Sequence, residues 1–146
     1  MNRLVKIVCL GFLLLTTTHL TASASGNKAT HSTSFDWSPI IEAIIQVESE
    51  GNPKAVSGNS CGAMQITPIM VKECNRILRQ RGNSKRYTLR DRFSVDKSKE
   101  MFLLIQSHSN PSNNVEQAIR AWNGGPRYST RRTQKYYDKV MRQMKK

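Results

Sequence analysis

The stretch VESEGNPKAVSGNSCGAMQITP, residues 47–68, joins two predicted helices through a polar loop. Upstream of it, isoleucines and a valine recur at helical spacing from residue 40 to residue 47, after a Ser-Pro pair that suits a helix start. The Gly-Asn-Pro at residues 51–53 ends this helix, because Gly accepts a left-handed cap and Pro cannot continue the helix. The Thr-Pro at residues 67 and 68 repeats the start signal. The stretch therefore predicts a helix, a loop and a second helix.

Glu48 lies in the last turn of the first predicted helix, on the same stripe as Ile41 and Ile45. Its carboxyl is therefore expected at the edge of the core, where desolvation raises the pKa of a carboxyl group. The negative end of the helix dipole acts in the same direction. A carboxyl that stays protonated near neutral pH is what cleavage of a glycosidic bond requires. The alternative is an ordinary helix-end glutamate that pairs with a basic residue.

The rest of the chain predicts further helices and no sheet. The second helix runs from Thr67-Pro68 to Gly82, and residues 82–93 are polar and basic, as expected of a surface loop. Later helices are predicted from Ser94, from Asn113 with Glu116 as a capping box, and from Thr133. No internal repeat and no alternating strand pattern is visible. A chain of 146 residues suits one core, so we expect a mainly α, single compact domain over residues 38–146.

The N-terminal residues 1–24 have the features of a secretory signal peptide. A basic start precedes the apolar run of residues 7–15, and Ala22-Ser23-Ala24 fits a signal peptidase site. The run is about half of the roughly 20 residues that a membrane-spanning helix needs. We therefore expect cleavage, no stable membrane anchor afterwards, and export to the periplasm, cell wall or medium. A retained anchor is the alternative. Residues 25–37 are predicted to be a flexible leader.

The composition bears on the binding partner, on a possible disulfide and on metal binding. The formal net charge of +13 implies a polyanionic partner, but an exported chain without a recognisable nucleic-acid module is not expected to bind nucleic acid. Cys61 and Cys74 are a candidate disulfide in an oxidising compartment, with two buried thiols as the alternative. His31 and His108 are not near a cysteine at metal-ligand spacing. We expect neither a metal nor a cofactor.

Two segments, residues 47–68 and 118–126, closely resemble the soluble lytic transglycosylase domain, a family within the lysozyme superfamily. The matching motifs follow one another in the family's order, which makes them far more specific together than singly. They read Glu48-Ser49, Asn52-Pro53, Ala55-Val56-Ser57, Gly62-Ala63-Met64-Gln65-Ile66 and Ala121-Trp122-Asn123-Gly124-Gly125. The resemblance covers roughly residues 38–142. Ala63 stands where the family usually has Leu, and Trp122 where it usually has Tyr.

The resemblance implies a lysozyme-like fold and a non-hydrolytic cleavage of peptidoglycan glycan strands. Glu48 would protonate the oxygen between N-acetylmuramic acid and N-acetylglucosamine. Its carboxylate would then accept the proton of the muramic C6 hydroxyl, which closes on C1 to give a 1,6-anhydro end. The resemblance also implies substrate-binding or supporting roles for six residues: Ser49, Met64, Gln65, Trp122, Asn123 and Tyr136. Tyr137 is the alternative to Tyr136, and core packing is the alternative for Trp122.

Three rival functions remain at the level of the sequence. A hydrolytic muramidase of the same fold would need a second carboxylate such as Glu50 or Glu73. A non-catalytic peptidoglycan-binding protein would keep the site without turnover. A basic nucleic-acid-binding protein would bind with a steep salt dependence. The biological setting is equally open: an envelope-spanning secretion or conjugation apparatus, wall remodelling, or phage lysis.

Overall fold

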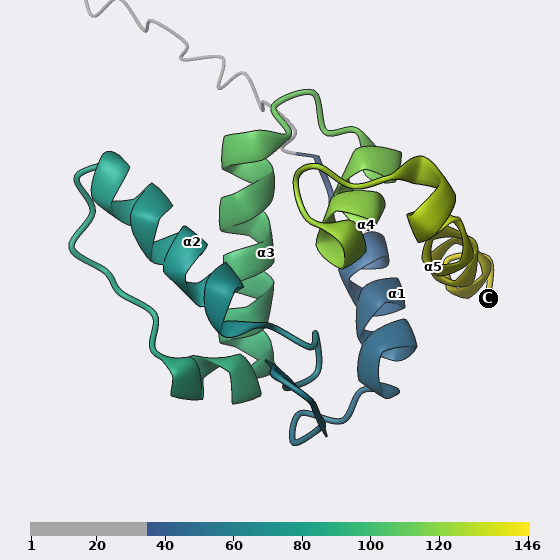
Figure 1. Ribbon diagram of the computed structural model, residues 1–146, viewed down its shortest axis with the longest axis horizontal. Coiled ribbons are helices and arrows are strands. Elements are labelled where there is room, and N and C mark those ends of the chain that lie inside the picture. Colours follow the sequence, from purple (N-terminus) through teal and green to yellow (C-terminus); the bar gives the residue numbers. More distant parts are fainter. Residues whose placement is uncertain (1–34) are drawn as a thin grey trace, which may run out of the picture. The chain divides into compact units, whose positions relative to one another are not determined.

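The computed structural model describes residues 35–146 (Figure 1). The predicted signal peptide and most of the predicted leader lie outside these residues. Short strands and a 3-10 helix accompany the α-helices of the described part. The elements are α1 (Ser38–Ser49), β1 (Val56–Ser57), β2 (Ser60–Cys61), α2 (Pro68–Gln80), η1 (Leu89–Phe93), α3 (Val95–Ser109), α4 (Val115–Gly124) and α5 (Thr130–Gln143).

Two helix starts confirm their sequence signals. The Thr67 hydroxyl accepts a hydrogen bond from the Met70 amide and Pro68 occupies the first position of α2. The Ser94 hydroxyl accepts one from the Lys97 amide at the start of α3. Each side chain satisfies an amide that has no partner inside the first turn of the helix.

The predicted starts of two other helices were wrong by one and by three residues. The cap of α4 is Asn114 rather than Asn113, and its side chain accepts from the Gln117 amide. Asn113 instead adopts a left-handed conformation with φ 53°. The last helix begins at Thr130 rather than near Thr133, because Ser129 is its cap. Thr133 lies inside the helix, where its hydroxyl donates to the Ser129 carbonyl.

Three further expectations need correction. Trp37 was placed in the flexible leader, but it is only 7% exposed and packs in the core directly before α1. The predicted loop at residues 82–93 contains η1 in its second half. A small antiparallel hairpin, β1 and β2, lies in the loop after α1. Its strands of two residues are too short to produce an alternating sequence pattern.

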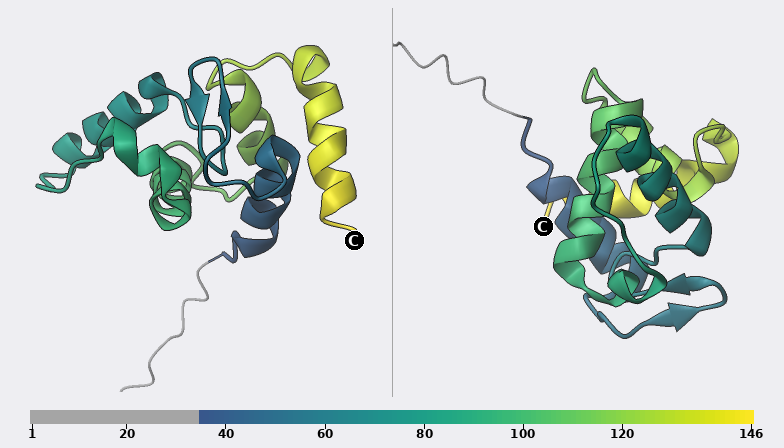
Figure 2. Two further views of the ribbon diagram at one scale, coloured as in Figure 1. Left: turned by 90° about the horizontal axis from the view of Figure 1, so that it is seen from below. Right: turned by 90° about the vertical axis from the view of Figure 1, so that its left-hand side faces the viewer.

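The helices form two groups that share one core. α1, α4 and α5 pack together, and α2 packs against α3, which also contacts η1. Figures 1 and 2 show α3 between α2 and the α1–α4 pair. Phe102 of α3 is fully buried, and its ring centroid lies 5.6 Å from that of Trp37 and 5.2 Å from that of Trp122. These aromatic contacts join the two groups.

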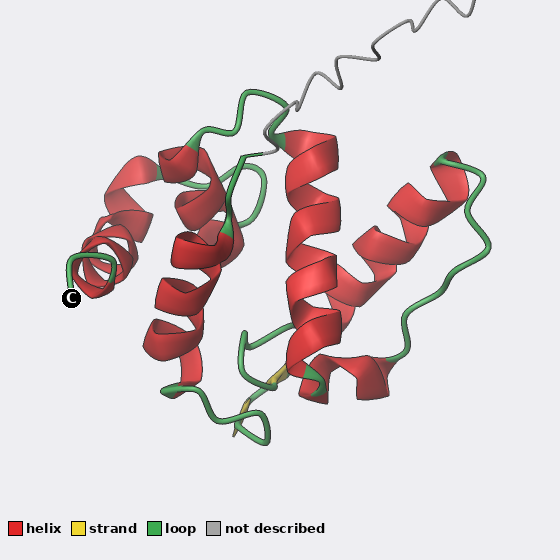
Figure 3. Ribbon diagram, turned by 180° about the vertical axis from the view of Figure 1, so that it is seen from behind, coloured by secondary structure: helices red, strands yellow, loops and turns green. Residues whose placement is uncertain are grey.

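Seen from behind in Figure 3, the described chain is almost entirely helix and loop, with the hairpin at one end. It forms one compact unit. The predicted fold class, a mainly α single domain, is therefore confirmed. Among residues 35–146, every helix falls short of the length or the apolar character that crossing a membrane demands.

Candidate active site

Glu48 meets Tyr136 where the end of α1 packs against α5. The Tyr136 hydroxyl donates a hydrogen bond of 2.7 Å to Oε1 of Glu48. The Glu48 side chain is half-buried. Desolvation raises the pKa of this carboxyl, and the hydrogen bond from Tyr136 opposes the increase without cancelling it. The pair thus combines a carboxyl that favours its protonated form with a donor that can stabilise the carboxylate.

Ser49 fixes the end of α1 to the loop that follows the hairpin. Its hydroxyl donates to the Ala63 carbonyl at 2.8 Å. Directly after the helix, Glu50 adopts a left-handed conformation with φ 54°, and Gly51 follows with φ 85°. The helix therefore stops one residue earlier than its Gly-Asn-Pro signal indicates. The resemblance implied a substrate-binding or supporting role for Ser49, and the structure gives its hydroxyl a bond that holds the backbone next to Glu48.

The loop at residues 62–66 is tied down by the side chains that the family motif supplies. Gln65 has a left-handed φ of 49°, and its amide Nε2 donates to the Gly62 carbonyl at 2.9 Å. Met64 is completely buried, and the Trp122 indole Nε1 donates to its carbonyl at 3.3 Å. These contacts link the loop to α4 and to the core.

The six residues that were predicted to bind or support the substrate therefore differ in burial and in contacts. Tyr136 alone contacts Glu48 through its side chain in a hydrogen bond. Met64 and Trp122 are 0% and 7% exposed, which corresponds to the supporting role for Met64 and the core-packing alternative for Trp122. Asn123 is exposed in the last turn of α4. Their roles toward a glycan stay predictions.

The candidate disulfide is not formed. Cys61 and Cys74 are both free and buried. The Cys74 thiol contacts the Met101 carbonyl of α3 at 3.8 Å, while Cys61 lies in β2 opposite Val56. Burial is the main cause that raises the pKa of Cys74 to about 12. The alternative of two buried thiols therefore describes this structure, and Cys74 serves as a small core residue.

The other acids offered as a second carboxylate are placed differently from Glu48. Glu50 is exposed at the left-handed cap of α1. Glu73 lies on α2, where Nε of Arg76 donates to Oε2 at 2.8 Å and this bond lowers the pKa of the carboxyl. Among the described residues, no three His, Cys, Asp or Glu side chains gather as metal ligands would.

The structure also distinguishes the two neighbouring tyrosines and adds Arg120, which the sequence reasoning missed. The Tyr137 ring stacks with the Arg120 guanidinium at 4.4 Å, whereas Tyr136 faces Glu48. Arg120 is 3% exposed and bonds to Glu116, Thr133 and Gln134. A signal for it existed, because Glu116 and Arg120 have the four-residue spacing of a helical ion pair.

Of the comparisons with known proteins, the one with protein families gives a match. The Transglycosylase SLT domain family matches residues 26–144 of the chain. No curated protein and no solved structure matches the chain. The family stands for lytic-transglycosylase-like domains that act on peptidoglycan, with a lysozyme-like fold. With Glu48 at the end of α1 and the matched residues spanning nearly all of the described structure, the chain belongs to the Transglycosylase SLT domain family.

Proposed function

We propose that this protein is a peptidoglycan lytic transglycosylase, with Glu48 as its single catalytic acid and base. It would cleave the β-1,4 bond between N-acetylmuramic acid and N-acetylglucosamine without water and leave 1,6-anhydro ends. The contact between Glu48 and Tyr136, at 2.7 Å, carries this proposal. Membership of the family supports the peptidoglycan substrate.

The carboxyl of Glu48 is suited to both halves of the reaction. Its raised pKa favours the protonated form that can give its proton to the glycosidic oxygen. As the C1–O bond breaks, the electron pair leaves with that oxygen and an oxocarbenium-like centre forms at C1. The Glu48 carboxylate then takes the proton of the C6 hydroxyl, and O6 bonds to C1. Glu48 ends the cycle protonated, so the reaction consumes no water.

Tyr136 supports the step in which Glu48 has lost its proton. Its hydroxyl donates to Oε1, and a hydrogen bond to an ionised acceptor is stronger than one to a neutral acceptor. Burial is also the main cause that raises the pKa of Tyr136, so the phenol keeps its proton and remains a donor. In this proposal Tyr136 is a positioning residue that acts through Glu48.

The placement of the other acids favours this mechanism over hydrolysis. A hydrolase of this kind uses two carboxylates on either side of the scissile bond. Glu73 is held by Arg76 and its pKa is lowered, and Glu50 is exposed at the helix cap. Glu73 is thus paired with a cation and Glu50 is exposed, whereas desolvation raises the pKa of Glu48.

The location of the substrate supports export. Peptidoglycan lies outside the cytoplasmic membrane, and the sequence predicts a signal peptide over residues 1–24. We therefore propose that the protein acts in the periplasm, in the cell wall or outside the cell. Opening the wall for an envelope-spanning secretion or conjugation apparatus is one role that such an enzyme would fill; wall remodelling and phage lysis are the others.

The test compares the products that the protein and two variants release from purified peptidoglycan, by mass spectrometry. Wild type and Glu50→Gln should release anhydro-muropeptides, and Glu48→Gln should release none. Glu50→Gln is the matched control, because it makes the same chemical change two residues away at an exposed position. Reducing-end products from the wild type would make the protein a hydrolase. An absence of products from all three proteins would favour the binding-protein alternative.

A further inference from the structure

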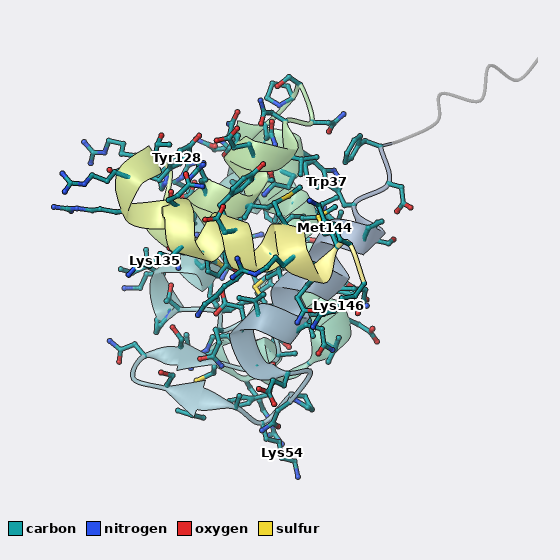
Figure 4. All side chains as sticks on the ribbon, turned by 90° about the vertical axis from the view of Figure 1, so that its right-hand side faces the viewer. Trp37, Lys54, Tyr128, Lys135, Met144 and Lys146 are labelled. Carbon is teal, nitrogen blue, oxygen red and sulfur yellow. The ribbon has the colours of Figure 1, made fainter. Side chains whose placement is uncertain are left out.

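A basic face runs along α5 on the side of the molecule next to Glu48. It consists of Lys135, Lys139 and Arg142, spaced so that they share one side of the helix, and of Lys146 just beyond it. Figure 4 looks onto α5, with Lys135 toward one end and Lys146 past the other. A shallow hollow lies there, lined by Val47, Lys139, Arg142, Gln143 and Lys146.

The charges of this face are not compensated within the described residues. The ion pairs of residues 35–146 involve other cations: Arg76, Lys85, Lys97, Lys99 and Arg120. The single acid of α5, Asp138, accepts a hydrogen bond from Gln134 instead. Lys135, Lys139, Arg142 and Lys146 are exposed. A hollow with uncompensated positive charge is suited to an anionic ligand.

The hollow lies beside the proposed catalytic site, and Glu48 and Tyr136 are not among the residues that line it. Val47 lines it and precedes Glu48 in α1, and Lys139 follows Tyr136 by three residues, one turn along α5. With a rise of about 1.5 Å per residue, Lys139 lies about 4.5 Å and Arg142 about 9 Å further along the axis than Tyr136. A ligand that extends from the reacting sugar would therefore meet these cations in succession.

The substrate carries such an extension. The muramic ring, whose C1 is attacked, bears a peptide stem on its lactyl group, and the stem has free carboxylates along its length. A stem of roughly four or five residues spans at most about 14 to 18 Å when extended. This reach covers the distance from Tyr136 past Arg142. The length of the stem and the negative charge of its carboxylates therefore both match the basic face of α5.

We propose that the basic face of α5 binds the carboxylates of the peptide stem, so that the protein prefers glycan strands that carry stems to strands without them. This proposal rests on the function proposed above. An anionic lipid surface fits the face less well, because a helix that binds a membrane surface presents exposed apolar side chains beside its cations. The exposed large hydrophobic residues of the described chain lie outside α5: Phe35, Val56, Ile69, Leu89, Phe93 and Leu103.

The test measures binding without turnover, in full-length protein with the Glu48→Gln substitution. Titration calorimetry compares three soluble ligands: glycan strands with stems, strands whose stems an amidase has removed, and strands whose stem carboxylates have been converted to amides. Adding Lys139→Gln and Arg142→Gln should weaken binding of the first ligand about two- to tenfold, as expected for two exposed charge contacts. Binding of the other two ligands should not change. Lys72→Gln with Arg79→Gln, two exposed cations of α2, is the matched control.

Several outcomes would overturn the stem site. One is an equal loss of affinity for all three ligands in the α5 variant, and another is an equal loss of affinity in the α2 control. A third is tighter binding of stem-free strands than of stem-bearing strands. Loss of binding to vesicles of anionic phospholipid, with unchanged binding of stem-bearing strands, would assign the face to a membrane instead. The proposed function fails separately: a wild-type protein that shows the stem preference but releases no anhydro-muropeptides would refute the reaction and leave the stem site standing.

Discussion

Glu48 and Tyr136 are 88 positions apart in the chain, yet their side chains share a hydrogen bond. Glu48 is positioned by the end of α1, and Tyr136 by the packing of α5 against α1. Burial and the tyrosine hydroxyl act on the pKa of the carboxyl in opposite directions, and burial has the larger effect. Removing the hydroxyl oxygen of Tyr136 would eliminate the cause that lowers this pKa and leave burial in place.

Replacing Tyr136 by Phe should lower the rate and shift the pH profile. The hydroxyl stabilises the Glu48 carboxylate by donating to it, and a hydrogen bond to a charged group contributes about 1.5–3 kcal/mol. Its loss should reduce kcat about 10- to 100-fold. The pKa of Glu48 should rise, because the donor lowers it in the wild type. The decline of the rate at high pH, where the acid is deprotonated, should therefore move to higher pH.

Tyr137→Phe is the control for this change, since Tyr137 is the neighbouring residue and its ring faces Arg120. It should leave the pH profile where it is. An equal shift in both variants, or a decline that moves to lower pH in Tyr136→Phe, would contradict the assignment of Tyr136 to Glu48.

Glu48 should make the fold less stable as the pH rises. Its pKa is higher in the folded state than the ordinary value of 4.5, so between these two pKa values the folded state binds more protons than the unfolded state. The free energy of unfolding therefore decreases through this window and levels off above the folded pKa, by about 1.4 kcal/mol for each unit of the increase. Glu48→Gln lacks this penalty. Its melting temperature should exceed that of the wild type at pH 7 and approach it at pH 4.

Glu50→Gln changes an exposed acid on the same segment and serves as the comparison for the melting experiment. A Glu48→Gln variant that is less stable than the wild type at pH 7 would mean that the carboxylate is stabilised in the fold. A carboxylate of that kind would accept hydrogen bonds in the fold but would be a poor proton donor in catalysis.

The sequence could identify Glu48 but could not choose its partner. The stripe of isoleucines places Glu48 at the edge of the core, and periodicity detects such a stripe. Tyr136 and Tyr137 are adjacent on one amphipathic helix, so periodicity leaves both near the core. Only the packing of α5 against α1 and α4 separates them: one faces Glu48 and the other Arg120.

At the scale of elements, the loop between β2 and α2 depends on one glycine. Gly62 has φ 79°, and a Cβ atom added there would lie 1.8 Å from the Arg92 carbonyl oxygen. Gly62→Ala would therefore have to move backbone of η1 or of the loop as well as adopt a strained conformation. We expect a loss of about 3 kcal/mol or more in the free energy of unfolding.

Gly58 in the hairpin turn provides the matched control. It also has a positive φ, 56°, but an added Cβ atom would meet nothing within 4 Å. Gly58→Ala should lower the free energy of unfolding only by the cost of a left-handed conformation for Ala, roughly 1–2 kcal/mol. Urea denaturation of both variants measures the difference. Equal losses would show that η1 does not press against the loop as described.

Arg120 joins α4 to the beginning of α5. Its guanidinium donates to the Thr130 carbonyl, the Thr133 hydroxyl and the Gln134 amide oxygen, at 3.0, 3.2 and 2.9 Å. Arg120→Lys keeps the charge but cannot reproduce the planar set of donors. It should destabilise the protein by about 2–3 kcal/mol. Because α5 carries Tyr136, the activity should decrease as well. Arg131→Lys, at an exposed site on α5, should leave both stability and activity unchanged.

The helix starts show where local sequence is sufficient. Thr67 and Ser94 are unambiguous caps, and both starts were predicted correctly. Before α4, two asparagines stand side by side, and the one that resembles a capping box with Glu116 is not the cap. Before α5, Ser129, Thr130 and Thr133 can all cap a helix, so local chemistry leaves several registers open. Tertiary contacts, such as those of Thr133 with Arg120, select one.

At the scale of the molecule, the two groups of helices depend on the aromatic cluster of Trp37, Phe102 and Trp122. Trp37 directly precedes α1, Phe102 belongs to α3, and Trp122 belongs to α4 and also bonds to the loop carbonyl of Met64. The cluster therefore connects the segment before α1, both helix groups and the loop beside Glu48. It was not predicted, because Trp37 lies outside any helical stripe and was assigned to the leader.

Replacing Phe102 by Ala tests whether the two groups unfold as one. Phe102 is completely buried, and a truncation of this kind costs about 3–5 kcal/mol. The melting temperature should fall by roughly 12 °C or more for a domain of this size. The chain has two tryptophans, and both contact Phe102, so their fluorescence reports on the core while circular dichroism reports on all helices. If one core holds both groups, the two signals should change at the same temperature in the wild type and in the variant. Separate transitions in the variant would mean that α2 and α3 can come apart from α1, α4 and α5, and that the loop beside Glu48 is held by its own hydrogen bonds alone.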